Sequence, residues 1–207
     1  MTLPHCDQKF GRMLMWTLAA AFGGALLIDR AALMTMRPPS RGLDRDPADL
    51  GLPLTPIRVR SGDYAIRGDL IEPREANPDS PIAVLVHGWT GNAGTMLLLA
   101  EPLLGAGIPT VVFDVRSHGR SDRAPAVTVR HFRDDLIRVV ERVRELRPER
   151  RVLVVGHSLG GAAGILACAR GAEIDGLALI AAPADLFEVT AGFFSDRGLP
   201  GDFLVRL

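Results

Sequence analysis

Short apolar runs that alternate with helical patterns constrain the fold of this chain more than any other feature. The first, in "PIAVLVHG", is apolar from Ile82 to Val86 and ends at a glycine, which is typical of a strand buried on both faces. Comparable runs recur at residues 110–115, 151–156 and 176–183. Segments of helical length separate them, so the alternation predicts an α/β fold: a mostly parallel sheet with helices on both faces.

The helical segments and the first strands complete this picture. Residues 129–146 place apolar side chains on one stripe at helical spacing, which predicts an amphipathic helix. Earlier in the chain, "IRVRSGDYAIRGDLIEP" predicts two short strands around a Ser-Gly-Asp turn. We therefore expect about six strands in a core at residues 57–185. Residues 37–56, rich in proline, glycine and charge, are expected to form a linker.

The N-terminal segment, residues 1–36, differs from the rest of the chain. Met13–Ile28 carries no charge and predicts an apolar helix, which at 1.5 Å per residue would span about 24 Å of a hydrocarbon core about 30 Å thick. Flanking arginines could extend that reach, so we expect a membrane anchor through residues 13–28 and a membrane-anchored protein. A signal peptide and a soluble helix remain alternatives, and cationic side chains on both flanks leave the orientation open.

Composition excludes several functional classes. The 207 residues suit one domain, and 24 basic side chains balance 24 acidic ones, so no overall charge would attract nucleic acid. Cys6 and Cys168 lie far apart without clustered histidines, so neither a disulfide framework nor a metal site is expected. The Gly-x-Gly-x-x-Gly pattern of dinucleotide loops is absent, and we expect no cofactor.

The residues with the clearest chemistry are Gly156-His157-Ser158-Leu159-Gly160, between a predicted strand and a predicted helix. In this position, Gly-x-Ser-x-Gly predicts a nucleophile elbow, a strained turn that exposes the serine hydroxyl above the sheet. The glycines relieve crowding, and the amide groups at the start of the helix face any negative charge that develops there. The alternative is a glycine-rich structural turn.

Two further motifs follow strand ends at the same predicted edge of the sheet. In "VLVHGWTGN", the backbone N–H of Trp89 could join that of Leu159 in an oxyanion hole, while His87 and Gly88 shape the loop. In "FDVRSHGRSD", Asp114 and His118 are expected to fix loops through hydrogen bonds to the backbone.

With "HGWTGN", "DVRSHGRS" and "GHSLGG" in this strand-helix order, the chain from Ile57 to Pro183 resembles the α/β-hydrolase superfamily, in particular its serine esterase, lipase and acylaminopeptidase-like members. The resemblance implies that Ser158 attacks an acyl carbonyl, that an acyl-enzyme forms, and that water releases the acid. It also implies that Trp89 and Leu159 supply the oxyanion N–H groups.

The same resemblance exposes a deficit. In this fold the acid and then the histidine follow the serine in the chain, yet every histidine here precedes Ser158: His5, His87, His118, His131 and His157. His118 is the least unsuitable substitute base, and Asp185 is a candidate acid. Six strands are also fewer than the eight of the family core. We therefore expect a C-terminally truncated hydrolase, in which residues 186–207 begin a cap and the chain alone is inactive.

Three functions remain open at this point. The first is a serine hydrolase that acts on carboxylic esters, lipids or amides through an acyl-enzyme on Ser158. The second is a non-catalytic binding or scaffold protein with the same fold. The third is an acyltransferase or a peroxidase-like member that uses the same serine.

Overall fold

The computed structural model describes residues 6–39, 42–43, 45–196, 198 and 201. The chain divides into two compact units, residues 1–37 and 38–207. His5 and part of the expected cap, namely residues 197, 199–200 and 202–207, lie outside the described residues.

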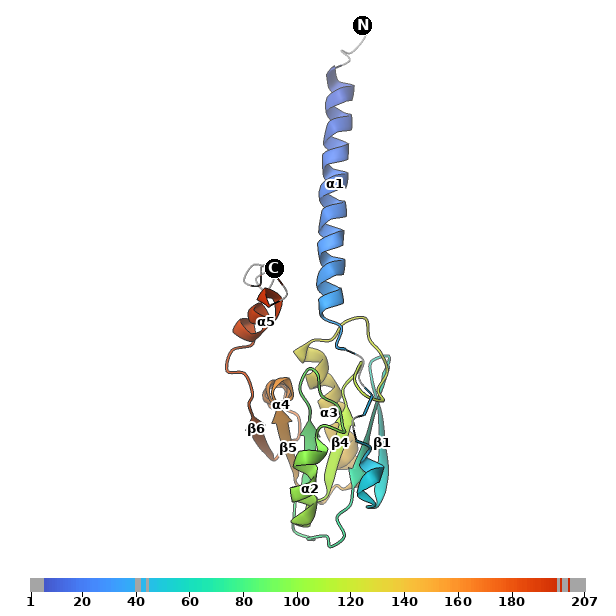
Figure 1. Ribbon diagram of the computed structural model, residues 1–207, viewed down its shortest axis with the longest axis vertical. Helices are drawn as coiled ribbons and strands as arrows, with labels where there is room; N and C mark the ends of the chain where they lie inside the picture. Colours follow the sequence, from blue (N-terminus) through green and yellow to red (C-terminus); the bar gives the residue numbers. More distant parts are fainter. Residues whose placement is uncertain (1–5, 40–41, 44, 197, 199–200, 202–207) are drawn as a thin grey trace. The chain divides into compact units, whose positions relative to one another are not determined.

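The first unit contains a single described helix, α1 (Cys6–Thr35), which includes the uncharged run predicted to be helical (Figure 1). No helix in the described part of the chain combines the length and apolar character that crossing a membrane requires. The expected membrane anchor at residues 13–28 is therefore wrong. The physical reason is that this run is only about 24 Å long, contains two glycines and ends at Asp29 and Arg30.

The second unit is built on a six-stranded sheet in the order β1-β2-β4-β3-β5-β6. The strands are β1 (Leu54–Ser61), β2 (Tyr64–Ile71), β3 (Ile82–Val86), β4 (Thr110–Asp114), β5 (Val152–His157) and β6 (Gly176–Ile180). β2 is antiparallel to β1 and β4, and the remaining pairs are parallel. The predicted α/β class is confirmed, with a mixed sheet in which the first two strands form the antiparallel part.

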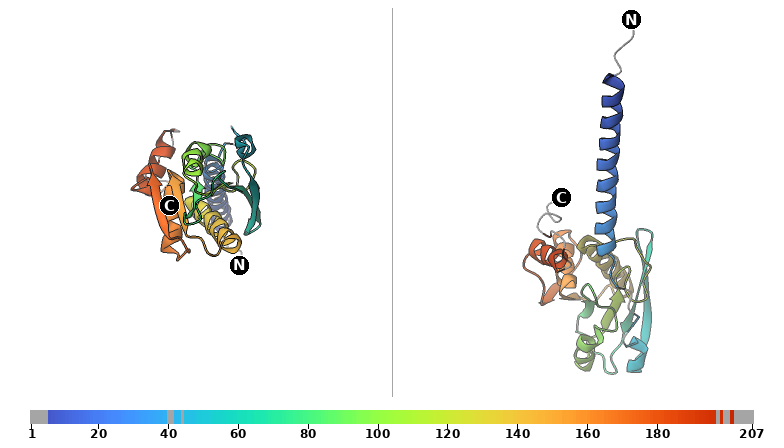
Figure 2. Two further views of the ribbon diagram at one scale, coloured as in Figure 1. Left: turned by 90° about the horizontal axis from the view of Figure 1, so that it is seen from below. Right: turned by 45° about the horizontal axis from the view of Figure 1, so that its top comes forward.

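Helices cover the two faces of this sheet. α2 (Leu97–Gly105) packs on one face, and α3 (Val129–Leu146) and α4 (Leu159–Ala169) pack on the other (Figure 2, left). The alternation of side chains along β3 explains its continuous apolar sequence. Val84 belongs to the core under α3 and α4, whereas Leu85 belongs to the core under α2.

The predicted linker also contains structure. Residues 47–50 form a 3₁₀ helix, η1 (Pro47–Leu50), because Asp46 accepts the Ala48 N–H as its N-cap and proline occupies the first helical position. The strand that follows begins at Leu54, slightly before the expected start of the core at residue 57.

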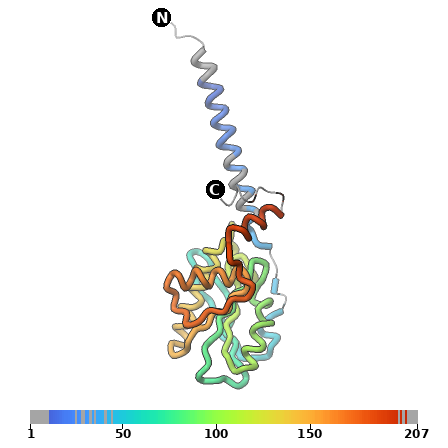
Figure 3. The backbone as a smooth tube through the Cα atoms, turned by 90° about the vertical axis from the view of Figure 1, so that its left-hand side faces the viewer, coloured from blue at the N-terminus to red at the C-terminus, as the bar shows by residue number. Residues whose placement is uncertain are grey.

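β6 is the outermost strand on its side of the described sheet, and it pairs with β5. After it, the chain passes through residues 181–185 into α5 (Leu186–Ser195), drawn in red in Figure 3. Ala178, Leu179 and Ile180 are exposed, in contrast to the buried residues of β3.

Candidate active site

Ser158 forms the turn between β5 and α4. Its backbone has φ 53° and ψ −121°, a conformation that residues other than glycine rarely adopt. Its N–H donates to the Ile180 carbonyl at 2.8 Å, which fixes the turn against β6. The side chain is half-buried, and its hydroxyl has no hydrogen-bond partner among the described residues.

The flanking glycines allow this close packing. A Cβ added at Gly156 would lie 2.5 Å from the Gly161 Cα, and one at Gly160 would overlap the Val86 carbonyl oxygen. Strand, turn and helix can approach this closely only because neither glycine carries a side chain.

The loop after β3 lies directly against the serine. A Cβ added at Gly88 would lie 3.1 Å from the Ser158 Cβ, so the Gly88–Trp89 peptide is next to the nucleophile candidate. The N–H groups of Trp89 and Leu159 have no backbone acceptor within the described part of the chain. Leu159 also begins α4, where the helix dipole favours negative charge. Such an arrangement can receive an oxyanion.

His87 is held in one protonation state by its surroundings. Its Nδ1 lies 2.7 Å from the Gly88 carbonyl oxygen, and its Nε2 accepts the Val115 N–H at 3.1 Å. The ring is fully buried, and burial, followed by the nearby His118 and then His157, lowers its pKa to about 3. His87 is therefore neutral, with its proton on Nδ1, and it shapes the loop.

Both nitrogens of His118 also lie next to backbone carbonyls. Nδ1 is 3.0 Å from the Arg116 oxygen and Nε2 is 2.6 Å from the Trp89 oxygen. The ring is buried, with its centroid 4.8 Å from that of His87. This geometry leaves neither nitrogen free to take a proton from Ser158.

Asp114 joins two loops at this edge of the sheet. One carboxylate oxygen accepts the Ala93 N–H at 2.7 Å, and the other accepts the Arg120 N–H at 3.0 Å. A Cβ at Gly119 would overlap this carboxylate, so glycine is needed where the second loop passes over it.

Two predicted site residues face solvent. His157, beside the nucleophile candidate, is exposed. Asp185 is also exposed and acts as the N-cap of α5, where its carboxylate accepts the Phe187 N–H at 2.7 Å. No histidine is paired with it among the described hydrogen bonds.

A buried ion pair, not predicted from the sequence, lies behind the loop that contains His118. Arg116 Nη2 lies 2.5 Å from Asp135 Oδ1, and the Arg116 N–H donates to Oδ2 at 2.9 Å. The same guanidinium donates to the Ser61 hydroxyl at 2.8 Å. The sequence carries a signal for this pair, because Asp135 lies three residues after Phe132 and four before Val139, which places it on the apolar stripe of α3.

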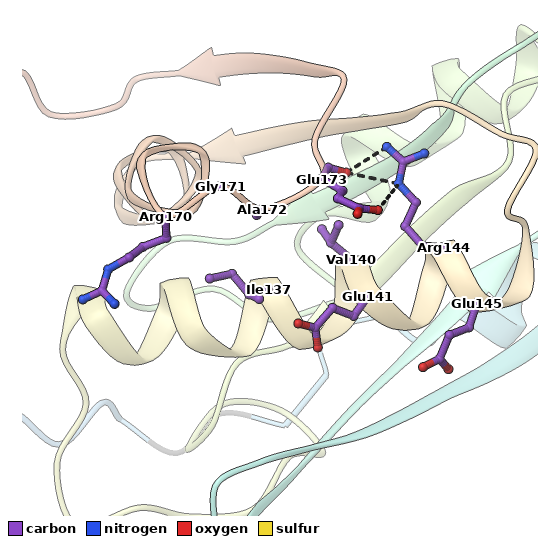
Figure 4. Close-up of a pocket in the computed structure, with 9 residues that line it drawn as sticks. All are labelled: Ile137, Val140, Glu141, Arg144, Glu145, Arg170, Gly171, Ala172 and Glu173. Carbon is purple, nitrogen blue, oxygen red and sulfur yellow. Dashed lines mark hydrogen bonds and ion pairs between the residues drawn. The ribbon is translucent and has the colours of Figure 1, made fainter.

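Two hollows on the described surface have no lining residue beside Ser158. One, of about 440 Å³, is bordered by α3 and by the loop after α4 (Figure 4). Its Arg144 is already bonded to the Glu173 carbonyl and to Asp175. A second hollow, of about 450 Å³, includes Ser61 and His131. Neither contains a residue next to the nucleophile, and no group of side chains suited to a metal occurs among the described residues.

Known proteins share this architecture. A family model described as serine aminopeptidase, S33, matches residues 78–191, more than half of the chain. An esterase of Pyrococcus furiosus is 24% identical with a TM-score of 0.65, and the alignment covers 83% of this chain and 64% of the esterase. The Est1E protein of Butyrivibrio proteoclasticus, solved with ferulic acid bound, is 24% identical with a TM-score of 0.58, over 66% of this chain and 56% of that one.

A proline iminopeptidase of Mycobacterium smegmatis is 22% identical with a TM-score of 0.53, over 69% of this chain and 50% of that enzyme. No curated protein is significantly similar to the chain. The chain thus spans less than two thirds of the length of the solved esterases that it matches. On the family match and the shared fold together, the chain belongs to the serine aminopeptidase S33 family of the α/β-hydrolase superfamily.

Proposed function

We propose that this chain carries the nucleophile and the oxyanion hole of a serine hydrolase that acts on carboxylic esters, lipids or amides. The observation that carries the proposal is the backbone of Ser158, held at φ 53° in a glycine-flanked turn with the Gly88–Trp89 peptide packed against it. Strained backbone of this kind persists where the surrounding structure enforces it, and it is common at active sites.

The proposed reaction begins when the Ser158 hydroxyl oxygen attacks the acyl carbonyl carbon and gives up its proton to a general base. The carbonyl oxygen gains the negative charge and accepts hydrogen bonds from the N–H groups of Trp89 and Leu159. Return of the proton to the leaving alcohol or amine releases that group and leaves an acyl-serine. Water then attacks the carbonyl carbon of the acyl-serine and gives a proton to the base. The base passes that proton to Ser158 Oγ as the bond from Oγ to the acyl carbon breaks and the acid departs.

We place the base outside the described residues. His87 and His118 are both engaged by backbone groups, and Asp185 caps a helix. This chain covers 64% and 62% of the solved esterase in two of its crystal forms. That partial coverage is compatible with an acid and a base supplied by further residues of a longer protein. On this proposal, the chain alone hydrolyses its substrate slowly, because it lacks the general base.

Similar proteins support the range of substrates. The family is described as a serine aminopeptidase, and the matched structures include esterases and a proline iminopeptidase. Ester and amide hydrolysis share the same acyl-enzyme chemistry, so both classes remain in the proposal.

The test is fluorophosphonate labelling of the full gene product, with the modified residue identified by mass spectrometry. We expect label on Ser158, and we expect Ser158→Ala to remove it and to lower ester turnover by about 10⁵-fold or more. Ser195→Ala, at an exposed serine of α5, is the matched control and should label like the unmodified protein.

Equal labelling of the folded Ser158→Ala variant would overturn the proposal. A folded gene product that takes up no label would favour the non-catalytic binding or scaffold alternative. Label that enters Ser158, followed by acyl transfer to an acceptor other than water, would favour an acyltransferase.

A further inference from the structure

We propose that His118 is a positioning residue for the oxyanion loop: its Nε2–H, donated to the Trp89 carbonyl, holds the Trp89 backbone in place beside Ser158. The inference rests on the proposed function, because it assigns a task to a residue that contributes no reacting atom.

The two peptide groups of Trp89 are each bonded to a buried histidine. The preceding peptide has its oxygen on Gly88, which lies 2.7 Å from His87 Nδ1 and also accepts the Gly91 N–H at 3.1 Å. The following peptide has its oxygen on Trp89, 2.6 Å from His118 Nε2. Both planes are therefore held, and rotation of either would break a buried hydrogen bond.

Holding these planes sets the direction of the oxyanion donor. The structure contains no cis peptide among its described residues, and in a trans peptide the N–H and C=O point in opposite directions. Because the Gly88 oxygen faces His87, the Trp89 N–H points away from that ring. Hydrogen bonding at the Gly88 oxygen also polarises the same peptide and strengthens its N–H as a donor.

His118 is well suited to position Trp89 because it is itself fixed. Its backbone N–H donates to the Val115 carbonyl at 2.9 Å; with the ring proton on Nε2, Nδ1 makes no hydrogen bond to the Arg116 carbonyl 3.0 Å away. Arg116 in turn is bound through both its backbone and its guanidinium to the buried carboxylate of Asp135 on α3. Hydrogen bonds to Arg116 and to the His118 backbone thus hold this loop between α3 and the Trp89 carbonyl.

A contact with the Trp89 side chain supports the same assignment. The rings of Trp89 and His118 meet edge-on with centroids 6.2 Å apart, and His118 also packs against Phe132 of α3. The histidine therefore restrains Trp89 through both its carbonyl and its ring.

The experiment replaces His118 by two amide side chains and so distinguishes the role of Nε2 from that of Nδ1. The amide nitrogen of His118→Gln can take the place of Nε2 and reach the Trp89 carbonyl, whereas that of His118→Asn can take only the place of Nδ1. In the full gene product, we expect His118→Asn to lower kcat for p-nitrophenyl acetate and the fluorophosphonate labelling rate by about 10–100-fold, with little change in KM. His118→Gln should recover most of both rates.

His131→Gln is the control for removing a partly buried histidine, because His131 accepts the Thr128 N–H at the start of α3 and contacts neither Trp89 nor Ser158. Its activity, corrected for the folded fraction, should stay unchanged. A second readout needs no activity: in a Trp16→Phe background, Trp89 is the only tryptophan, and His118→Asn should increase its quenching by acrylamide while His118→Gln should not.

The outcomes distinguish this inference from the proposed function. If the unmodified gene product neither labels nor turns over substrate, the proposed function fails. If it is active but the Asn and Gln variants of His118 have equal rates, or if both quench like the unmodified protein, the positioning role of His118 is wrong.

Discussion

β3 and β6 have similar apolar sequences, "IAVLV" and "GLALI", but very different environments. Every residue of β3 is buried, because β4 and β5 flank it and helices pack on both faces. In β6, Leu179 is 47% and Ile180 is 36% exposed. An apolar run therefore predicts a strand, whereas the burial of that strand depends on neighbours that its own sequence does not encode.

The polar groups near these strands differ in the same way. His87 and Asp114, at the ends of β3 and β4, are completely buried and fully hydrogen-bonded. Asp185, which follows β6, is exposed and satisfied by the first amides of α5. Substitutions in the covered region should therefore cost far more than equivalent ones in the open region.

The largest expected difference concerns charge. Asp135→Ala should lower the free energy of unfolding by about 3–5 kcal/mol, because it leaves the buried Arg116 guanidinium without its partner. Glu141→Ala on the same helix removes an exposed partner of Arg138 and should cost less than about 1 kcal/mol. Urea unfolding measures both. Equal losses would mean that the Arg116 pair is hydrated in solution.

A leucine pair tests the two strands directly. Leu85→Ala in β3 should cost about 2–5 kcal/mol, since the side chain is fully buried and its removal leaves a cavity. Leu179→Ala in β6 should cost less than about 1 kcal/mol, since nearly half of that residue is already exposed. If thermal or urea unfolding gives the same loss for both, β6 is covered in solution and the comparison breaks down.

The smallest expected effect is the dependence on pH. Below about pH 6.5 the unfolded chain protonates His87, whereas the folded protein, in which the pKa of His87 is about 3, does not. The contribution of His87 to stability is thus complete above pH 6.5 and declines as the pH falls toward 3, by roughly 2 kcal/mol at pH 5.

The matched variants for this pH measurement lie at the ends of two neighbouring strands, β3 and β5. His87→Gln should flatten the change in unfolding free energy between pH 7 and pH 5, and His157→Gln, at the exposed end of β5, should retain it. A steep slope that survives in His87→Gln would assign the acid sensitivity to other groups.

Much of this architecture could be predicted from the sequence, because its signals are local. Apolar runs, the helical stripe of residues 129–146 and the turn at Gly62 each depend on near neighbours, and the strands follow them closely. The membrane anchor was wrong because a short uncharged run was extended by assuming that flanking arginines would reach the interface. The 3₁₀ helix at Pro47–Leu50 was missed because composition outweighed the capping signal of Asp46.

The candidate site was predictable only in part. Gly88 and Ser158 belong to motifs whose positions at strand ends bring them to one edge of the sheet, and the structure places them in contact. The partners of His118 could not be inferred, because its contact with the Trp89 carbonyl joins loops 29 residues apart. The Arg116–Asp135 pair likewise depends on the packing of α3 beneath the loop.

The left-handed backbone at Ser158 has an evolutionary consequence. Conformations of this kind cost on the order of 1–3 kcal/mol in residues with a side chain, and glycine adopts them with little penalty. In a lineage freed from the need for the hydroxyl, random drift would therefore favour glycine at this position, and the fold would become more robust as its chemistry disappeared. A serine at this position therefore carries a backbone cost that glycine would avoid.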